Sequence, residues 1–132
     1  TNRFVELQLE GFRPPGPEAF AALIRRVIAD DSCHCLIASI DGTDAGVAGV
    51  TVYKHSGCLI AGTTLEAHRR RGVQTALIIE RLRIARDAGC THICVGSSPT
   101  VATGRNAIRL GFVPAYTKAT LVHPRPGLVP SE

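Results

Sequence analysis

The sequence predicts an α+β fold in which helices flank a mixed β-sheet, with an antiparallel meander and one parallel strand pair. Short apolar segments at residues 35–40, 47–53 and 58–65 are separated by turn residues, which is typical of an antiparallel meander. An amphipathic segment at 73–88 is followed by an apolar segment at 91–95. A strand, a crossover helix and a second strand in succession predict parallel pairing.

The N-terminal part of the chain predicts one clear helix. A proline-rich turn at 13–17 can be neither helix nor central strand. The helix expected after it, at 18–29, carries one apolar stripe made of Phe20, Leu23, Ile24, Val27 and Ile28. Residues 1–12 are weakly patterned, and we expect either the end of a helix or a first strand at 4–9.

The C-terminal part predicts two short elements. A helix at about 102–110 should stop at Gly111, and an apolar segment at 115–122 indicates a last strand. Residues 124–132 are expected to form a loose tail. The 132 residues are enough for a single domain, 1–132.

Composition narrows the function classes. The chain has no long apolar run and its N-terminus shows no export signal, so we expect a cytoplasmic protein that does not bind membranes. Its five cysteines show no Cys-x-x-Cys pair, so no metal site is expected. We expect the strand cysteines Cys35, Cys58 and Cys94 to be small buried hydrophobes.

Charge is distributed unevenly along the chain. Residues 1–65 hold five Lys/Arg against seven Asp/Glu, whereas residues 66–132 hold ten against four. A basic half can bind nucleic acid, a membrane surface or a polyanionic small molecule. With few aromatic residues, a base-stacking surface is poorly supported, so no nucleic acid is expected. A phosphate-rich small molecule explains the charge more economically.

The most informative segment is the arginine turn, residues 66–72, between the third apolar segment and the helix at 73–88. Arg69, Arg70 and Arg71 precede Gly72, where the backbone can approach an anion closely. The first N–H groups of a helix lack intrahelical partners, and the helix dipole adds positive charge there. Phosphate is the expected ligand at such a helix start.

The run Arg69-Arg70-Arg71-Gly72-Val73-Gln74 resembles the (Gln/Arg)-x-x-Gly-x-(Gly/Ala) motif of the GNAT acetyltransferase superfamily, with Gln74 at the usual Gly/Ala position. The late segment that ends in Leu110-Gly111-Phe112 is similar to the family's late helix. The resemblance covers about residues 35–122 and implies a GNAT-like fold. Because the family usually opens with a further strand and helix, we expect either a fragment or a first strand at 4–9.

The resemblance implies acetyl-CoA as co-substrate and direct transfer of its acetyl group to a primary amine of a small molecule or peptide. Pantetheine, an extended chain of amides, can pair with an exposed strand edge. The cofactor-binding residues that the resemblance implies are Gly62, Thr63, Thr64, Arg69, Arg70, Arg71, Gly72, Val73, Gln74, Thr75 and Asn106. The oligomeric state stays open, with a homodimer as one option.

The position of the family's usual thiolate acid, a tyrosine, is Ala107 in this chain. The remaining catalytic candidates are Glu66 as a base, with Tyr116 and Asn106 near the thiolate, although each has an ordinary structural interpretation as well. His68 could also accept a proton near neutral pH, but an exposed turn histidine is the simpler interpretation. The alternative function is therefore a non-catalytic GNAT domain that binds CoA or a partner.

Overall fold

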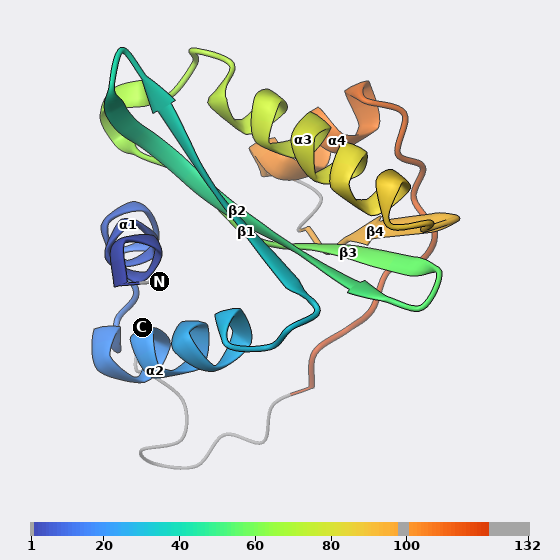
Figure 1. Cartoon of the computed structure of the whole chain (residues 1–132), viewed down its shortest axis with the longest axis horizontal. Coiled ribbons are helices and arrows are strands. Elements are labelled where there is room, and N and C mark those ends of the chain that lie inside the picture. Colours follow the sequence, from blue (N-terminus) through green and yellow to red (C-terminus); the bar gives the residue numbers. More distant parts are fainter. Residues whose placement is uncertain (1, 98–100, 122–132) are drawn as a thin grey trace.

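The computed structural model describes residues 2–97 and 101–121. It confirms the predicted α+β class, with helices on both sides of a mixed sheet (Figure 1). The elements in chain order are α1 (Asn2–Phe12), α2 (Pro17–Ile28), β1 (Cys33–Ile40), β2 (Thr43–Tyr53), β3 (Ser56–Thr64), the 3₁₀ helix η1 (Glu66–His68), α3 (Val73–Asp87), β4 (His92–Val95) and α4 (Ala102–Arg109).

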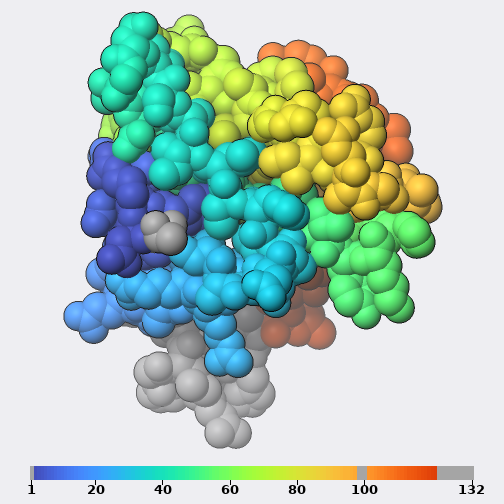
Figure 2. Space-filling view, viewed as in Figure 1, coloured from blue at the N-terminus to red at the C-terminus, as the bar shows by residue number. Residues whose placement is uncertain are grey.

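The sheet has the strand order β1-β2-β3-β4. The first three strands are antiparallel and β4 lies parallel to β3, as the sequence predicts. Helices α1 and α2 pack on one face, whereas α3 and α4 lie on the other (Figure 1). In Figure 2, β1 forms an uncovered edge between α2 and α3.

The core follows the alternation of side chains along β2. Val47 is fully buried in a cluster with residues of α1 and α2. Ala48 and Val50 point the opposite way and pack against α3, which contributes Leu77 and Ile78. Because successive strand residues face opposite sides, one strand supplies the core of both layers.

Two predicted strands are wrong. For residues 1–12 the helical alternative is confirmed, and the first strand proposed at 4–9 is wrong. The segment belongs to α1, because Phe4, Val5, Leu7 and Gln8 have the spacing of one helix face and are buried against the sheet. The predicted last strand also fails: residues 115–121 form neither helix nor strand and are exposed. Residue 122 and the predicted tail lie outside the described residues.

The cysteines are less buried than predicted. Cys35 and Cys94 are exposed, and Cys58 is half-buried. Burial raises the pKa of Cys33 to about 12 and that of Cys58 to about 11. Both side chains therefore stay neutral thiols near pH 7, as expected for packing residues rather than nucleophiles.

The feature that positions the site is the separation of β3 from β4. The two strands pair only from Ser56 to Leu59 on β3, and β3 continues to Thr64 without a partner on that side among the described residues. On its other side the β2–β3 register shifts between Val47 and Gly49, at a bulge where Ala61 has φ 47°. The bulge and the free strand edge therefore coincide.

Candidate functional site

The arginine turn enters α3 through two left-handed residues. Arg70 has φ 63° and Gly72, the N-cap of α3, has φ 79°. No side chain caps the helix, and the amide of Ala76 makes the helix's first bond, to the carbonyl of Gly72 (3.0 Å). The earlier amides of Val73, Gln74 and Thr75 have no intrahelical acceptor. This terminus can therefore donate to an anion.

Gln74 connects the start of α3 to α4. Its Nε2 donates a hydrogen bond to Thr103 Oγ1 (2.8 Å), and its Oε1 accepts one from Asn106 Nδ2. The side chain is thus held against α4, on the wall of the space beside β3. Asn106, a predicted site residue, contacts this site through Gln74.

A cavity of about 220 Å³, called the splay cavity below, occupies the place where β3 and β4 part. It lies between the end of α1, the free part of β3, α3, and the segment after β4. Its lining residues are Phe12, Leu59, Ile60, Ala61, Gly62, Gln74, Arg81, Val95, Gly96, Ser97, Val101 and Thr103. No acidic residue is among them, and Arg81 carries the only formal charge on the described lining.

Arg81 is buried, with 4% of its surface exposed. Its Nε donates to the carbonyl of Leu77 (3.0 Å), and its Nη1 donates to the carbonyls of Gly49 (3.2 Å) and Ile60 (3.3 Å). No described carboxylate pairs with it. Burial lowers the pKa of Arg81 to about 10. Holding the charged form in the fold therefore costs roughly 3 kcal/mol.

A second buried side chain holds the bulge from the opposite face. Gln8 of α1 is fully buried, and its Nε2 donates to the carbonyl of Ala61. Its Oε1 is the one enclosed side-chain polar atom, among the described residues, without a hydrogen-bond partner. Gln8 and Arg81 thus bond consecutive carbonyls of β3 from the two sides of the sheet.

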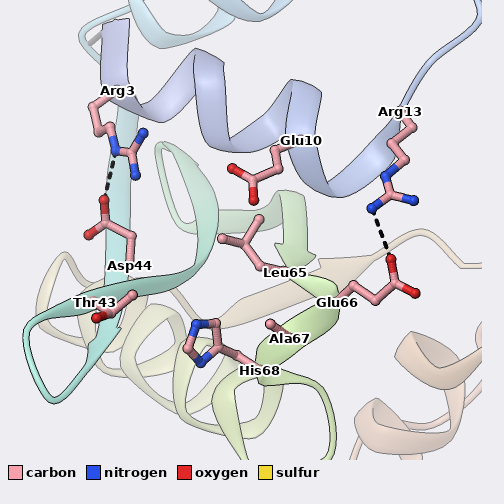
Figure 3. Close-up of a pocket in the computed structure, with 9 residues that line it drawn as sticks. All are labelled: Arg3, Glu10, Arg13, Thr43, Asp44, Leu65, Glu66, Ala67 and His68. Carbon is pink, nitrogen blue, oxygen red and sulfur yellow. Dashed lines mark hydrogen bonds and ion pairs between the residues drawn. The ribbon is translucent and has the colours of Figure 1, made fainter.

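A larger cavity of about 520 Å³, called the outer cavity below, lies between α1 and the arginine turn (Figure 3). Its lining residues are Arg3, Glu10, Arg13, Thr43, Asp44, Leu65, Glu66, Ala67 and His68. Arg3 pairs with Asp44 (2.7 Å) and Arg13 with Glu66 (2.9 Å), while the Glu10 carboxylate points into the space between the pairs. The charges are therefore largely neutralised in exposed pairs.

The structure brings part of the predicted site together. Gly62 and Gln74 line the splay cavity, and Asn106 contacts Gln74. Thr63 and Thr64 continue the free edge of β3 and pair with β2 on the other side. The remaining predicted cofactor residues lie in the turn and first helical turn: Arg69, Arg70, Arg71, Gly72, Val73 and Thr75.

The predicted catalytic residues are not assembled around one point. Glu66 lines the outer cavity, where it pairs with Arg13. Tyr116 is 83% exposed and lines neither cavity. Ala107, at the position of the usual tyrosine, is 4% exposed and faces the core.

Sequence reasoning missed Arg81 and Gln8. The signal for Arg81 was its place four residues after Leu77 and four before Ala85, within the apolar stripe of α3. Gln8 interrupts an apolar helix face in the same way. A charged or amide side chain on a core-facing stripe needs buried partners, and both residues find them on the bulge.

Residues 2–97 and 101–121 contain neither a metal-binding cluster nor a helix that could span a membrane. No cluster of three or more His, Cys, Asp or Glu side chains could hold a metal ion. Of the described helices, none is long and apolar enough to cross a bilayer.

A protein-family model matches most of the chain. Residues 1–112 match the model of the acetyltransferase (GNAT) family. No curated protein sequence matches the chain. The sequence match begins at the first residue, so it includes α1 and α2, which lie before the predicted range of resemblance.

Solved structures share the fold at low sequence identity. One is the aminoglycoside 6'-N-acetyltransferase AAC(6')-IG from Acinetobacter haemolyticus, with TM-score 0.74, 19% identity, and 94% of this chain and 92% of that chain covered. Another is AAC(6')-Iy in complex with the bisubstrate analogue CoA-S-monomethyl-acetylneamine, with TM-score 0.73, 21% identity, and coverage of 94% and 90%. A predicted acetyltransferase with acetyl-CoA from Clostridium acetobutylicum gives TM-score 0.70, 14% identity, and coverage of 92% and 88%.

Proposed function

Because the chain belongs to the acetyltransferase (GNAT) family, we propose that it transfers an acetyl group from acetyl-CoA directly to a primary amine of a small molecule or peptide. The observation that carries the proposal is the splay cavity. It lies beside a free strand edge and an uncapped helix start, and no acidic residue lines it. These are the features that an extended, polyanionic thioester requires.

The pyrophosphate end would lie at the start of α3. The free amides of Val73, Gln74 and Thr75 point toward an anion placed there, and Arg69, Arg70 and Arg71 supply charge. Gly72, in its left-handed conformation, lets the turn present these amides without a side chain in front of them.

The pantetheine arm would follow β3. Beyond Leu59 the strand has no partner on the side of β4, so the backbone groups of Gly62, Thr63 and Thr64 border a free edge. An amide chain can pair with such an edge as an added strand does. The acetyl group would then reach the apex of the splay, near Leu59 and Val95.

The amine would approach from the side of α1. Glu66 and Glu10 are two carboxylates of the outer cavity, where both would favour binding of a cationic acceptor. Glu66 lies seven residues along the chain from Leu59, so its proposed part is to attract the amine rather than to take a proton at the thioester. Asn106 would act by holding Gln74. Tyr116 receives no part in the proposed mechanism, because it lines neither cavity.

Direct transfer asks mainly for positioning. Holding the amine against the thioester can supply on the order of 7–11 kcal/mol of the barrier, and one placed base adds roughly 10²–10⁴-fold. A domain without the usual tyrosine can therefore still be an enzyme, although a slower one.

The buried Ala107 supports a second candidate, a GNAT domain that binds CoA or a partner without catalysis. The experiment that separates the two candidates measures thiol release from acetyl-CoA over a panel of primary amines, together with thermal shift by acetyl-CoA. Release above the hydrolysis rate supports the enzyme. A thermal shift without release supports the binding domain, and neither signal from folded protein overturns both candidates.

A further inference from the structure

The splay cavity contains a cation, Arg81, that pairs with no carboxylate of the described residues. Two of the three nitrogens of Arg81 donate to backbone carbonyls: Nε to Leu77, and Nη1 to Gly49 and Ile60. Nη2 has no acceptor among the described residues. It is also not an enclosed atom, since Gln8 Oε1 is the one enclosed orphan in the described chain. Nη2 therefore keeps access to the cavity that Arg81 lines.

The guanidinium lies directly beside the neighbouring strand. A Cβ built on Gly62 would lie 3.5 Å from Nη2 and 3.6 Å from Nη1 of Arg81, which is ordinary van der Waals contact. Both nitrogens therefore lie next to the free segment of β3. The carbonyls that fix Nη1 belong to the residues on either side of the bulge, so the same irregularity exposes the strand edge and aims the cation.

No other group competes for this charge. The lining that α1, β3, β4 and α4 contribute around Arg81 is uncharged: Phe12, Leu59, Ile60, Ala61, Gly62, Val95, Val101 and Thr103. Gln74, Gly96 and Ser97 complete the described lining and carry no titratable side chain. A buried charge that no carboxylate neutralises is costly, and a ligand's negative charge can offset that cost.

The distance from Gly72 to Arg81 along α3 matches the length of the pantetheine arm that ends in the thioester. Arg81 lies nine positions beyond Gly72 on α3, about 14 Å along the helix axis. Pantetheine is an amide chain about as long as four extended residues, which span roughly 14 Å. A ligand whose pyrophosphate lies at the start of α3 therefore brings its sulfur to the depth of Arg81.

We propose that Arg81 binds the sulfur end of the acyl thioester and stabilises the thiolate that leaves it. The proposal rests on the proposed acyltransferase function. In this proposal a permanent cation stabilises the leaving thiolate, which a proton donor at position 107 would otherwise protonate.

The step conserves atoms and electrons. The amine nitrogen bonds to the carbonyl carbon, and the carbonyl π pair moves onto oxygen. That pair then returns as the carbon–sulfur bond breaks, and the bonding electrons leave on sulfur as a thiolate. The amine loses its proton to water, so the products are an acetamide and a thiolate paired with the guanidinium. A charge fixed in advance beside the sulfur stabilises such an anion without reorganisation.

The test compares CoA with desulfo-CoA, which keeps the phosphates and pantetheine but lacks the sulfur. Affinities for both are measured between about pH 6 and 9, in wild type, in Arg81→Gln, and in Arg86→Gln as the control. Arg86 lies on the exposed face of the same helix and pairs with Asp87. A free thiol ionises near pH 8.5, and each tenfold gain in binding corresponds to one pKa unit.

In wild type and Arg86→Gln, the preference for CoA over desulfo-CoA should rise at least tenfold with pH and level off near pH 8.5. In Arg81→Gln it should stay flat, and turnover should fall roughly 10²–10³-fold, as for loss of one preorganised donor, with a smaller change in KM for acetyl-CoA. If Arg81→Gln fails to fold, the pH dependence of the wild-type preference for CoA over desulfo-CoA decides the role of Arg81.

A flat wild-type preference, with both ligands bound, overturns the role of Arg81 and leaves the proposed function standing. Arg81 would then be a structural residue that holds the bulge. Failure of folded wild type to bind either ligand overturns the proposed function and the role of Arg81 together.

Discussion

The two cavities of this domain differ in how their charged residues are paired and buried. The outer cavity holds Arg3 and Arg13 against Asp44 and Glu66, in pairs that face solvent. The splay cavity holds a single cation, Arg81, which is buried and has no carboxylate partner. The larger space therefore carries three carboxylates against two guanidinium groups, whereas the smaller one carries a single buried cation.

The difference shows where the fold carries an energetic cost. Exposed ion pairs contribute about 0–1 kcal/mol and are easily gained or lost. A buried charge without a counter-ion lowers stability and persists only when something else compensates it. We therefore place the chemistry at the splay cavity and assign the outer cavity to acceptor entry.

The largest effect is expected from charge placed at the start of α3. Gly72→Asp and Gly72→Asn both put a side chain on a residue with φ 79°, where Asn and Asp are tolerated at about 1–2 kcal/mol. The strain is similar in the two variants, but only Asp adds a negative charge where the pyrophosphate should lie. Thermal shift with acetyl-CoA should disappear in Gly72→Asp and persist in Gly72→Asn.

The size of the thermal shift depends on how much ligand binding stabilises the folded state. In wild type, acetyl-CoA at a hundredfold excess over Kd should stabilise the fold by roughly 2.7 kcal/mol. Equal shifts in Gly72→Asp and Gly72→Asn would place the phosphate site elsewhere. The arginine turn would then be only a basic loop.

The next effect concerns Glu66. Glu66→Gln keeps the shape of the side chain but removes its carboxylate, so the KM for a cationic amine should rise while acetyl-CoA still binds, because the outer cavity loses one of the charges that favour a cation. Arg13→Gln is the matched control, because it breaks the same 2.9 Å pair and keeps the carboxylate. Steady-state rates at saturating acetyl-CoA and varied amine concentration measure the difference. Equal KM values in the two variants would show that Glu66 is only an ion-pair partner.

A smaller effect is expected from the bridge between α3 and α4. Gln74→Ala removes the hydrogen bonds to Thr103 and Asn106, which should lower the free energy of unfolding by about 1–2 kcal/mol. It also installs the residue usual in the motif and clears space at the helix start, so acetyl-CoA should bind more tightly. Chemical denaturation and calorimetry measure the two effects.

Thr103→Ala controls for the bridge alone, since it removes one of the bonds and leaves the start of α3 unchanged. Weaker binding in Gln74→Ala would mean that the Gln74 side chain itself contacts the ligand. That result would contradict the view that the side chain only restricts the helix start.

Much of the fold could be predicted because local patterns and packing agree there. Val47, Val50 and Leu59 of the predicted strands are buried in the core. In the predicted stripe of α2, Ile24 is buried, whereas Leu23 is exposed. Residues of α1 misled the prediction because the buried Gln8 breaks the apolar pattern, and its partner, the carbonyl of Ala61, lies across the sheet. The segment 115–121 has strand composition but makes no strand pairing.

The candidate site could also be predicted only in part. The arginine turn could be found because an anion site at a helix start is a local feature of sequence. Arg81 could not, since its meaning depends on a bulge in β3 and on the point where β4 diverges. The role of a buried charge follows from tertiary contacts, and spacing along one helix only marks it as unusual.

The smallest effect is expected at Tyr116. Tyr116→Phe should leave turnover and acetyl-CoA affinity unchanged, because the side chain is 83% exposed and borders neither cavity. Steady-state kinetics over the amine panel check this. A drop of tenfold or more would show that the segment 113–121 folds over the site when substrate binds.

The division between the cavities can be tested most directly by titrating the labelled protein with CoA and following backbone amide shifts by NMR. We predict that the largest shifts fall on the splay cavity and the start of α3, at Gly62, Gln74 and Gly96, with little change at Thr43 and Asp44 of the outer cavity. Shifts centred on Thr43 and Asp44, or no shifts in folded protein at millimolar CoA, would contradict the account.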